Sequence, residues 1–183
     1  REQLYKLPVS KISDPSIREL YRAIVDSYAT KIELITNIGT PQFHYNSLRY
    51  YGEPSTKDIA NARFLLHAGQ IPNAKIEQPN IDAADAKIAF EEAVKAMGYD
   101  CKVVLSTRIV AKAMVNNTRK ILLVNKSMQF TQLEIHALIH HELGVHMATT
   151  LNAENQPLHV LRMGLPGNTY TQEGLAILSE YLS

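Results

Sequence analysis

The sequence contains one cysteine and almost no net charge. Its 183 residues carry 19 Lys and Arg against 18 Asp and Glu, a formal net charge of +1 at pH 7. This balance gives no electrostatic reason to expect binding to nucleic acid or to an anionic membrane surface. Cys101 has no second cysteine to pair with, so an intrachain disulfide and a cysteine-based zinc site are both excluded. We expect Cys101 to be a buried or half-buried strand residue rather than a nucleophile.

Long apolar segments are also lacking. No apolar run reaches the length that spans a membrane, and no signal-peptide pattern precedes the first predicted helix. A cytoplasmic location is the default expectation. The chain is 45% hydrophobic and 20% charged, which suffices for one substantial core. We expect a single domain over residues 1–183, helical over about 1–98 and holding a sheet and the site over about 99–183. Because the chain begins at Arg1 and its last helix ends without a cap, we expect it to be a fragment of a longer chain.

Histidine is the residue type that the sequence concentrates. Four of the seven histidines lie between His136 and His146, within an otherwise apolar helical pattern. Neutral imidazole is the commonest protein ligand for zinc, and a catalytic zinc takes three protein ligands plus a water. His141 and His146 could supply two ligands, Glu142 could serve as the base beside them, and Glu173 could complete the set. This pattern indicates a metal-dependent hydrolase.

The spacing of these histidines is unusual. Residues four apart share a face of a helix, whereas five apart puts His141 and His146 roughly 140° apart in projection. Both can face one metal only if the helix absorbs an extra residue as a π-bulge, a distortion that is frequent at functional sites. Gly144 lies between them, where the absence of a Cβ makes such a distortion cheaper. The alternative pair is His136 and His140, which are four apart, although no carboxylate follows His136 directly.

The C-terminal part of the chain resembles a known family. The run HHELGVHMATTLNAENQPLHVLRMGLPGNTYTQEGLAILSEYL, over residues 140–182, is similar to the HExxxH metallopeptidases that include the microtubule-associated tyrosine carboxypeptidase. It is more similar still to their bacterial relatives named for a QEGLA motif, the flavohemoglobin expression-modulating proteins. The clear match begins at about Val104. The resemblance implies that His141, His146 and Glu173 bind zinc and that Glu142 is the catalytic carboxylate. It implies no particular substrate.

Helix signals occupy the first half of the chain. Asp14 followed by Pro15 predicts the start of a helix that ends near Gly39. Residues 40–54 read as a turn-rich connection, a second helix is predicted over about 55–67, and residues 70–81 read as a loop. A third helix is predicted from Asp82 to Gly98. Near the C-terminus, residues 170–183 predict a further helix. We expect its apolar side to comprise Leu175, Ala176, Leu178 and Leu182.

The middle of the chain has the period of strands. Residues 101–105, 110–115 and 120–124 read as strands, and the last two are joined at a hairpin turn around Asn116 and Asn117. Thr131 and Glu134 then form a capping box that starts the histidine-bearing helix, and Phe130 with Ile135 has the spacing of a hydrophobic staple. The expected fold is α+β and zincin-like, with helices packed on a short antiparallel sheet and the metal-binding helix under its edge. An extended peptide can pair with such an edge strand.

These observations favour a zinc-dependent peptidase, most simply a carboxypeptidase acting on the C-terminus of a peptide or protein. Such an enzyme needs a cation for the terminal carboxylate, and an Arg fits best because its fork matches both oxygens. Arg162 is the first candidate, followed by Lys112 and Arg119, and Tyr170 could donate to an oxyanion. His140 and His159 could orient a metal ligand.

A second interpretation is a catalytically silent protein that uses a metal for stability and acts as a binding or regulatory protein. That interpretation needs a fourth protein ligand, such as His140 or Glu180, to close the site.

Overall fold

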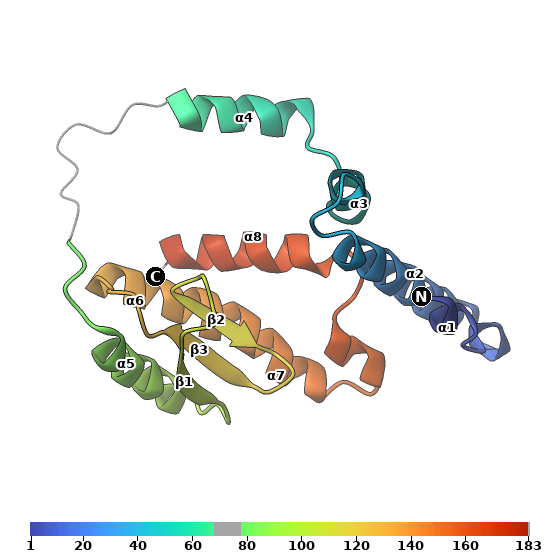
Figure 1. The fold of residues 1–183 in the computed structure, drawn as a ribbon. Coiled ribbons are helices and arrows are strands. Elements are labelled where there is room, and N and C mark those ends of the chain that lie inside the picture. The colour runs from blue at the N-terminus through green and yellow to red at the C-terminus, as the bar shows by residue number, and fades with distance from the viewer. Residues whose placement is uncertain (68–77, 183) are drawn as a thin grey trace. The chain divides into compact units, whose positions relative to one another are not determined.

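The computed structural model describes residues 1–67 and 78–182, and the chain divides into two compact units, Arg1–Ala74 and Lys75–Ser183. The helices of the first unit are coloured blue to blue-green in Figure 1. They are α1 (Glu2–Tyr5), the 3₁₀ turn η1 (Val9–Lys11), α2 (Pro15–Thr36), α3 (Gln42–Tyr51) and α4 (Thr56–His67).

The long helix α2 begins as predicted. The side chain of Asp14 accepts a hydrogen bond of 2.9 Å from the backbone N–H of Ile17, and Pro15 occupies the first helical position. Helix α3 lies within residues 40–54, so the prediction of a turn-rich connection there was wrong. The prolines that suggested turns, Pro41 and Pro54, flank this helix instead of interrupting it, and Gly52 ends it with a φ of 88°.

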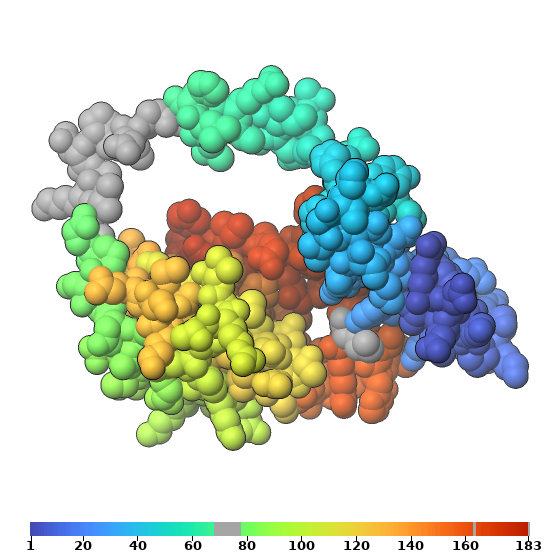
Figure 2. Space-filling model, viewed as in Figure 1, coloured from blue at the N-terminus to red at the C-terminus, as the bar shows by residue number. Residues whose placement is uncertain are grey.

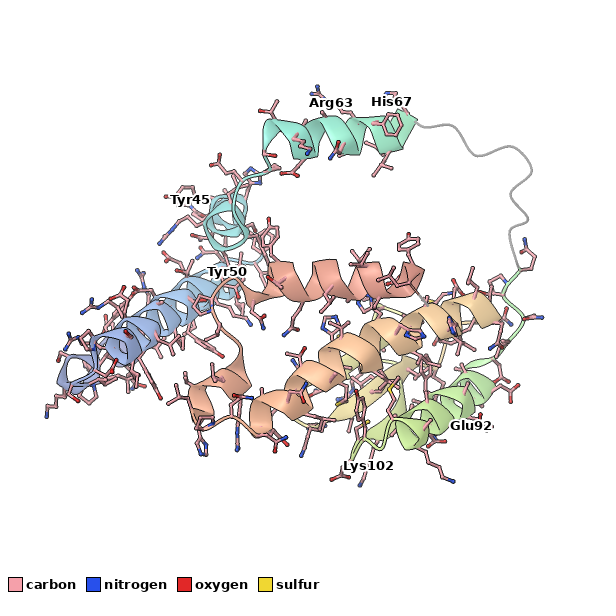
Figure 3. The ribbon with its side chains drawn as sticks, turned by 180° about the vertical axis from the view of Figure 1, so that it is seen from behind. Tyr45, Tyr50, Arg63, His67, Glu92 and Lys102 are labelled. Atoms are coloured by element: carbon pink, nitrogen blue, oxygen red, sulfur yellow. The ribbon has the colours of Figure 1, made fainter. Side chains whose placement is uncertain are left out.

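Helix α4 agrees with its prediction. Its start is capped by the carboxylate of Asp58, which accepts the backbone N–H of Ser55 at 2.8 Å. Figure 3 shows Arg63 and His67 on its last turns, where Nδ1 of His67 donates to the carbonyl of Arg63 at 2.7 Å. None of the residues of α4 is buried. The loop predicted over residues 70–81 falls largely outside the described residues.

In the second unit, helix α5 (Ala83–Ala96) starts at the predicted cap, where Asp82 accepts the N–H groups of Ala84 and Asp85. Three strands follow: β1 (Lys102–Ser106), β2 (Ala113–Asn116) and β3 (Ile121–Asn125). Their order is β1-β3-β2.

Strands β2 and β3 form the predicted antiparallel hairpin, but β1 and β3 run parallel. The sheet is therefore mixed, and the prediction of a purely antiparallel sheet was wrong. The strand with the longest apolar run, β3, takes the central position, where Leu122 and Val124 are completely buried.

One face of this sheet is covered and the other is open. Val103 lies beside Leu122, and Ala113 beside Val124, on the buried face. Val104 and Met114 are exposed on the opposite face, which faces the viewer in Figure 2. The buried face joins one hydrophobic cluster with residues of α5 and of the histidine-bearing helix. Its completely buried members from those helices are Ala86, Phe90, Leu143 and Met147. The histidine-bearing helix therefore packs on the hydrophobic core through its buried side chains.

The histidine-bearing helix has three consecutive parts: α6 (Gln132–Leu138), the π-helix η2 (Ile139–Met147) and α7 (Ala148–Glu154). The capping box is present, since the Thr131 hydroxyl accepts the Glu134 N–H at 3.0 Å and the Glu134 carboxylate accepts the Thr131 N–H at 2.9 Å. Within η2 the hydrogen bonds skip an extra residue, as between the Ala148 N–H and the Leu143 carbonyl. The predicted π-type distortion is confirmed.

The chain then passes through the 3₁₀ turn η3 (His159–Met163) into α8 (Asn168–Tyr181). Only part of the predicted apolar side of α8 is buried. Ala176 is inaccessible, whereas Leu175, Leu178 and Leu182 are 52%, 51% and 77% exposed. Across the described part of the chain, no helix combines the length and the apolar character needed to cross a bilayer.

Candidate metal centre

The π-helix η2 brings His141 and His146 to the same side of the helix. Their ring centroids lie 5.0 Å apart, although five residues of a regular α-helix would separate them by roughly 140°. Helix α8 adds a carboxylate from the other side. Glu173 lies 3.9 Å from Nε2 of His141 and 3.7 Å from Nε2 of His146. One ligand atom from each of the three residues lies within 4.8 Å of the other two.

The hydrogen bonds of the two imidazoles are made by Nδ1, which leaves Nε2 of each ring available to a metal. Nδ1 of His141 lies 2.6 Å from a carboxylate oxygen of Glu180, and Nδ1 of His146 lies 3.2 Å from the amide oxygen of Gln172. These oxygens accept, so Nδ1 carries the hydrogen and Nε2 of a neutral ring keeps its lone pair. Two imidazole nitrogens and one carboxylate oxygen are the donor set of a zinc site with three protein ligands. The residues therefore fit a divalent ion such as zinc.

Glu142 lies next to this group but is held by a different contact. It is only 7% exposed, and one of its carboxylate oxygens accepts the backbone N–H of Val115 at 2.9 Å. Val115 belongs to β2, which lies at the edge of the sheet. Burial raises the pKa of the Glu142 carboxyl. The Val115 hydrogen bond and the two neighbouring histidines lower it again only in part, so it stays above its usual value. Such a carboxyl is suited to accept and release a proton.

The residues predicted to bind substrate lie in three different places. Lys112 precedes β2, and its ammonium is 2.6 Å from the carboxylate of Glu134. Arg162 lies in η3 and donates to the backbone carbonyl of Glu154 at 3.0 Å. Tyr170, in the first turn of α8, is 71% exposed. The roles of these three residues in substrate binding therefore stay predictions.

The remaining histidines lie outside the three-ligand group. His140 packs its ring edge-on against His136, with centroids 4.7 Å apart, and His159 is exposed in η3. The alternative pair His136 and His140 gains no third ligand among the described residues. Cys101 is half-buried just before β1, where burial and the charge of Asp100 raise the pKa of its thiol. A raised pKa disfavours the thiolate, in keeping with a packing role.

Two contributors to the site were not foreseen in these roles. Gln172 was not singled out, and Glu180 was considered only as a fourth metal ligand, yet each holds Nδ1 of one histidine. Gln172, Ala176 and Glu180 are spaced i, i+4, i+8 on α8, and this stripe faces η2. A signal was present in the sequence, because two polar residues flank a small residue at helical spacing next to the QEGLA glutamate.

Together, these features define an α+β protein in which a bulged helix and the helix after it form a candidate His–His–Glu metal centre. The chain belongs to the microtubule-associated tyrosine carboxypeptidase (MATCAP) family, whose family model matches residues 1–183. The resemblance seen in the sequence is confirmed. Membership implies a carboxypeptidase-like peptidase with a protein or peptide as its substrate. Searches of curated proteins and of solved structures find no match.

Proposed function

We propose that this protein is a zinc-dependent carboxypeptidase that hydrolyses the C-terminal peptide bond of a peptide or protein. The observation that carries the proposal is the buried Glu142 carboxylate, which directly follows one histidine of the three-ligand group and is fixed by the edge strand. A site that used metal only for stability has no need of a buried carboxylate at this position.

In the proposed reaction, His141, His146 and Glu173 would hold the ion as its three protein ligands. Zinc, when bound, lowers the pKa of a coordinated water to about 7 and polarises the scissile carbonyl. Glu142 takes the proton of the attacking water and hands it to the leaving amine, as a general base and then a general acid. The Val115 N–H keeps the Glu142 carboxylate oriented during both transfers.

The edge strand β2 supplies a place for an extended substrate. The N–H of Val115 points away from β3 toward Glu142, so the outer edge of β2 runs beside the proposed base. The Val115 N–H is engaged by Glu142, so an extended peptide would pair with the other backbone groups of this edge and carry its backbone past Glu142, as in the zincin-like arrangement that the sequence predicts. Backbone pairing fits a peptidase that recognises its substrate mainly by its terminus.

Arg162 stays the first candidate for binding the terminal carboxylate. Its contact with the Glu154 carbonyl does not neutralise its charge, whereas the charge of Lys112 is compensated by Glu134. The exposed Tyr170 remains a candidate donor to an oxyanion. A cytoplasmic location also remains an expectation from the sequence.

The test compares two isosteric variants. Glu142→Gln keeps the shape and the acceptor for the Val115 N–H but cannot take a proton, so zinc should stay bound while turnover falls by about 10²–10⁴-fold. Glu173→Gln removes a charged ligand and should lower zinc uptake. The assay follows release of the last amino acid from peptides with varied C-termini, aromatic residues first, with the zinc content of each protein measured. Equal turnover by the parent and Glu142→Gln would remove Glu142 from the chemistry.

The alternative is a catalytically silent, metal-stabilised binding or regulatory protein. It requires a fourth protein ligand, but among the described residues the ligand group contains three. The two residues considered for the fourth place have other partners, since the His140 ring packs edge-on against His136 and Glu180 bonds to Nδ1 of His141. Zinc bound in full, with no turnover of any peptide, would favour this alternative.

A further inference from the structure

We propose that Glu180 and Gln172 are positioning residues that set the metal affinity of the two histidine ligands, with Glu180 the stronger of the two. This inference rests on the proposed metal site but concerns residues that lie outside the ligand group. It assigns to α8 a second task besides carrying Glu173.

The two contacts follow from how α8 lies against η2. Gln172, near the start of α8, meets His146 near the end of η2, and Glu180, near the end of α8, meets His141 near the start of η2. The two helices therefore run in opposite directions where they touch. Ala176, midway between Gln172 and Glu180, is completely buried, and its small side chain allows the close approach that both hydrogen bonds need.

The chemistry of the two acceptors differs. A carboxylate accepts a stronger hydrogen bond than a neutral amide does, because its charge assists the bond. The distances agree, at 2.6 Å from Glu180 to His141 and 3.2 Å from Gln172 to His146. An acceptor on Nδ1 fixes the tautomer and the ring orientation, and a carboxylate there also makes Nε2 a better donor to a metal. His141 should therefore be the more tightly bound and better oriented of the two ligands.

The same contacts could simply dock α8 onto the histidine-bearing helix. The two roles make different predictions. A docking role alone changes the stability of the metal-free protein. A positioning role changes the affinity for metal and depends on the charge of the side chain that accepts the Nδ1 hydrogen. Two substitutions separate the two roles. Glu180→Gln replaces the charged acceptor beside His141 with a neutral one, and Gln172→Glu replaces the neutral acceptor beside His146 with a charged one.

The experiment measures zinc affinity of the whole chain by competition with a chromophoric chelator, together with thermal unfolding of the metal-free protein. Glu180→Ala should weaken zinc binding by about 10–100-fold, the usual effect of removing such a partner. Glu180→Gln should weaken it less, and Gln172→Glu should strengthen it. The matched control is Glu154→Gln, which removes a carboxylate that pairs with Lys120 and contacts no imidazole. Its zinc affinity should equal that of the parent.

Visible absorption of the cobalt-loaded proteins completes the test, because the intensity of the cobalt bands reports the coordination number. The bands should keep their intensity in Glu180→Gln, and a change would make Glu180 a ligand and overturn its positioning role. Parent-like zinc affinity in both Glu180 variants, with altered unfolding alone, would also overturn the proposal. If Glu180→Ala does not fold, the isosteric Glu180→Gln still decides the matter. A parent protein that binds no zinc would instead refute the metal site itself.

Discussion

Replacing Gly144 with alanine tests whether the π-helix between the two histidines depends on a residue without a side chain. The sequence suggested that glycine makes the distortion cheaper. In the structure, a Cβ on Gly144 would lie 3.9 Å from the carbonyl oxygen of Ile139, and apart from its chain neighbours and the nearby backbone of its own helix it would meet no other heavy atom within 4 Å. This is an ordinary van der Waals distance, and the φ of Gly144 is not positive. We therefore expect Gly144→Ala to stabilise the protein by about 0.4–1 kcal/mol, because alanine lowers the entropy of the unfolded chain.

A change of this size corresponds to a rise in melting temperature of roughly 2–8 °C for a domain of about 60–100 residues. The measurement is thermal unfolding of the metal-free protein by circular dichroism, with zinc uptake per chain determined in parallel. Gly174→Ala is the matched control, since Gly174 lies in the regular helix α8 and a Cβ there would meet nothing within 4 Å outside its chain neighbours and the nearby backbone of its own helix. Both variants should gain alike and keep their zinc. Destabilisation or loss of zinc in Gly144→Ala alone would show that the distortion needs glycine after all.

Three further outcomes are expected. Deleting Gly144 should leave zinc uptake intact, because the two histidines would then be four apart and share a face of a regular helix, and metal analysis of the purified variant decides this. Leu143→Ala should cost about 2–5 kcal/mol in urea unfolding, since Leu143 is completely buried under the site, and a smaller loss would mean that the core closes around the cavity. Burial raises the pKa of Glu134, but the hydrogen bonds from Lys112 and Thr131 outweigh it and the net pKa is lowered. The stabilisation from Glu134 is therefore present above its unfolded pKa and lost as the pH falls through the folded one, so Glu134→Gln should flatten the acid limb of the stability curve.

Local signals in the sequence predicted the starts of α2, α5 and the histidine-bearing helix, and the structure has them where expected. The caps at Asp14 and Asp82 and the capping box of Thr131 with Glu134 depend on hydrogen bonds between residues two or three apart. Such contacts form within one turn of helix, so the residues alone specify them. The error over residues 40–54 came from the same kind of signal, because Pro41 and Pro54 flank α3 and do not interrupt it.

The order of the strands could not be read in this way. Pairing of β1 with β3 joins Lys102–Ser106 to Ile121–Asn125 across an intervening strand, and no local pattern encodes a parallel neighbour. The hairpin of β2 and β3 was predictable because a short turn fixes its direction. The strand with the most apolar surface to bury takes the central position. That choice depends on a comparison between the strands, and no single segment of the sequence encodes it.

The apolar side of α8 shows why the site was easier to predict than the packing around it. A periodicity argument assigns Leu175 and Leu178 to the interior because apolar residues usually face a core. Here the side of α8 that meets η2 carries Gln172, Ala176 and Glu180, and the leucines point away from it. Burying polar side chains costs free energy unless they are hydrogen-bonded, and their partners are the two imidazoles that the histidine spacing had already singled out. The residues that determine how α8 packs are thus the ones that orient the histidines. At this helix, polar contacts with the site decide which side faces the rest of the unit, and apolar periodicity does not.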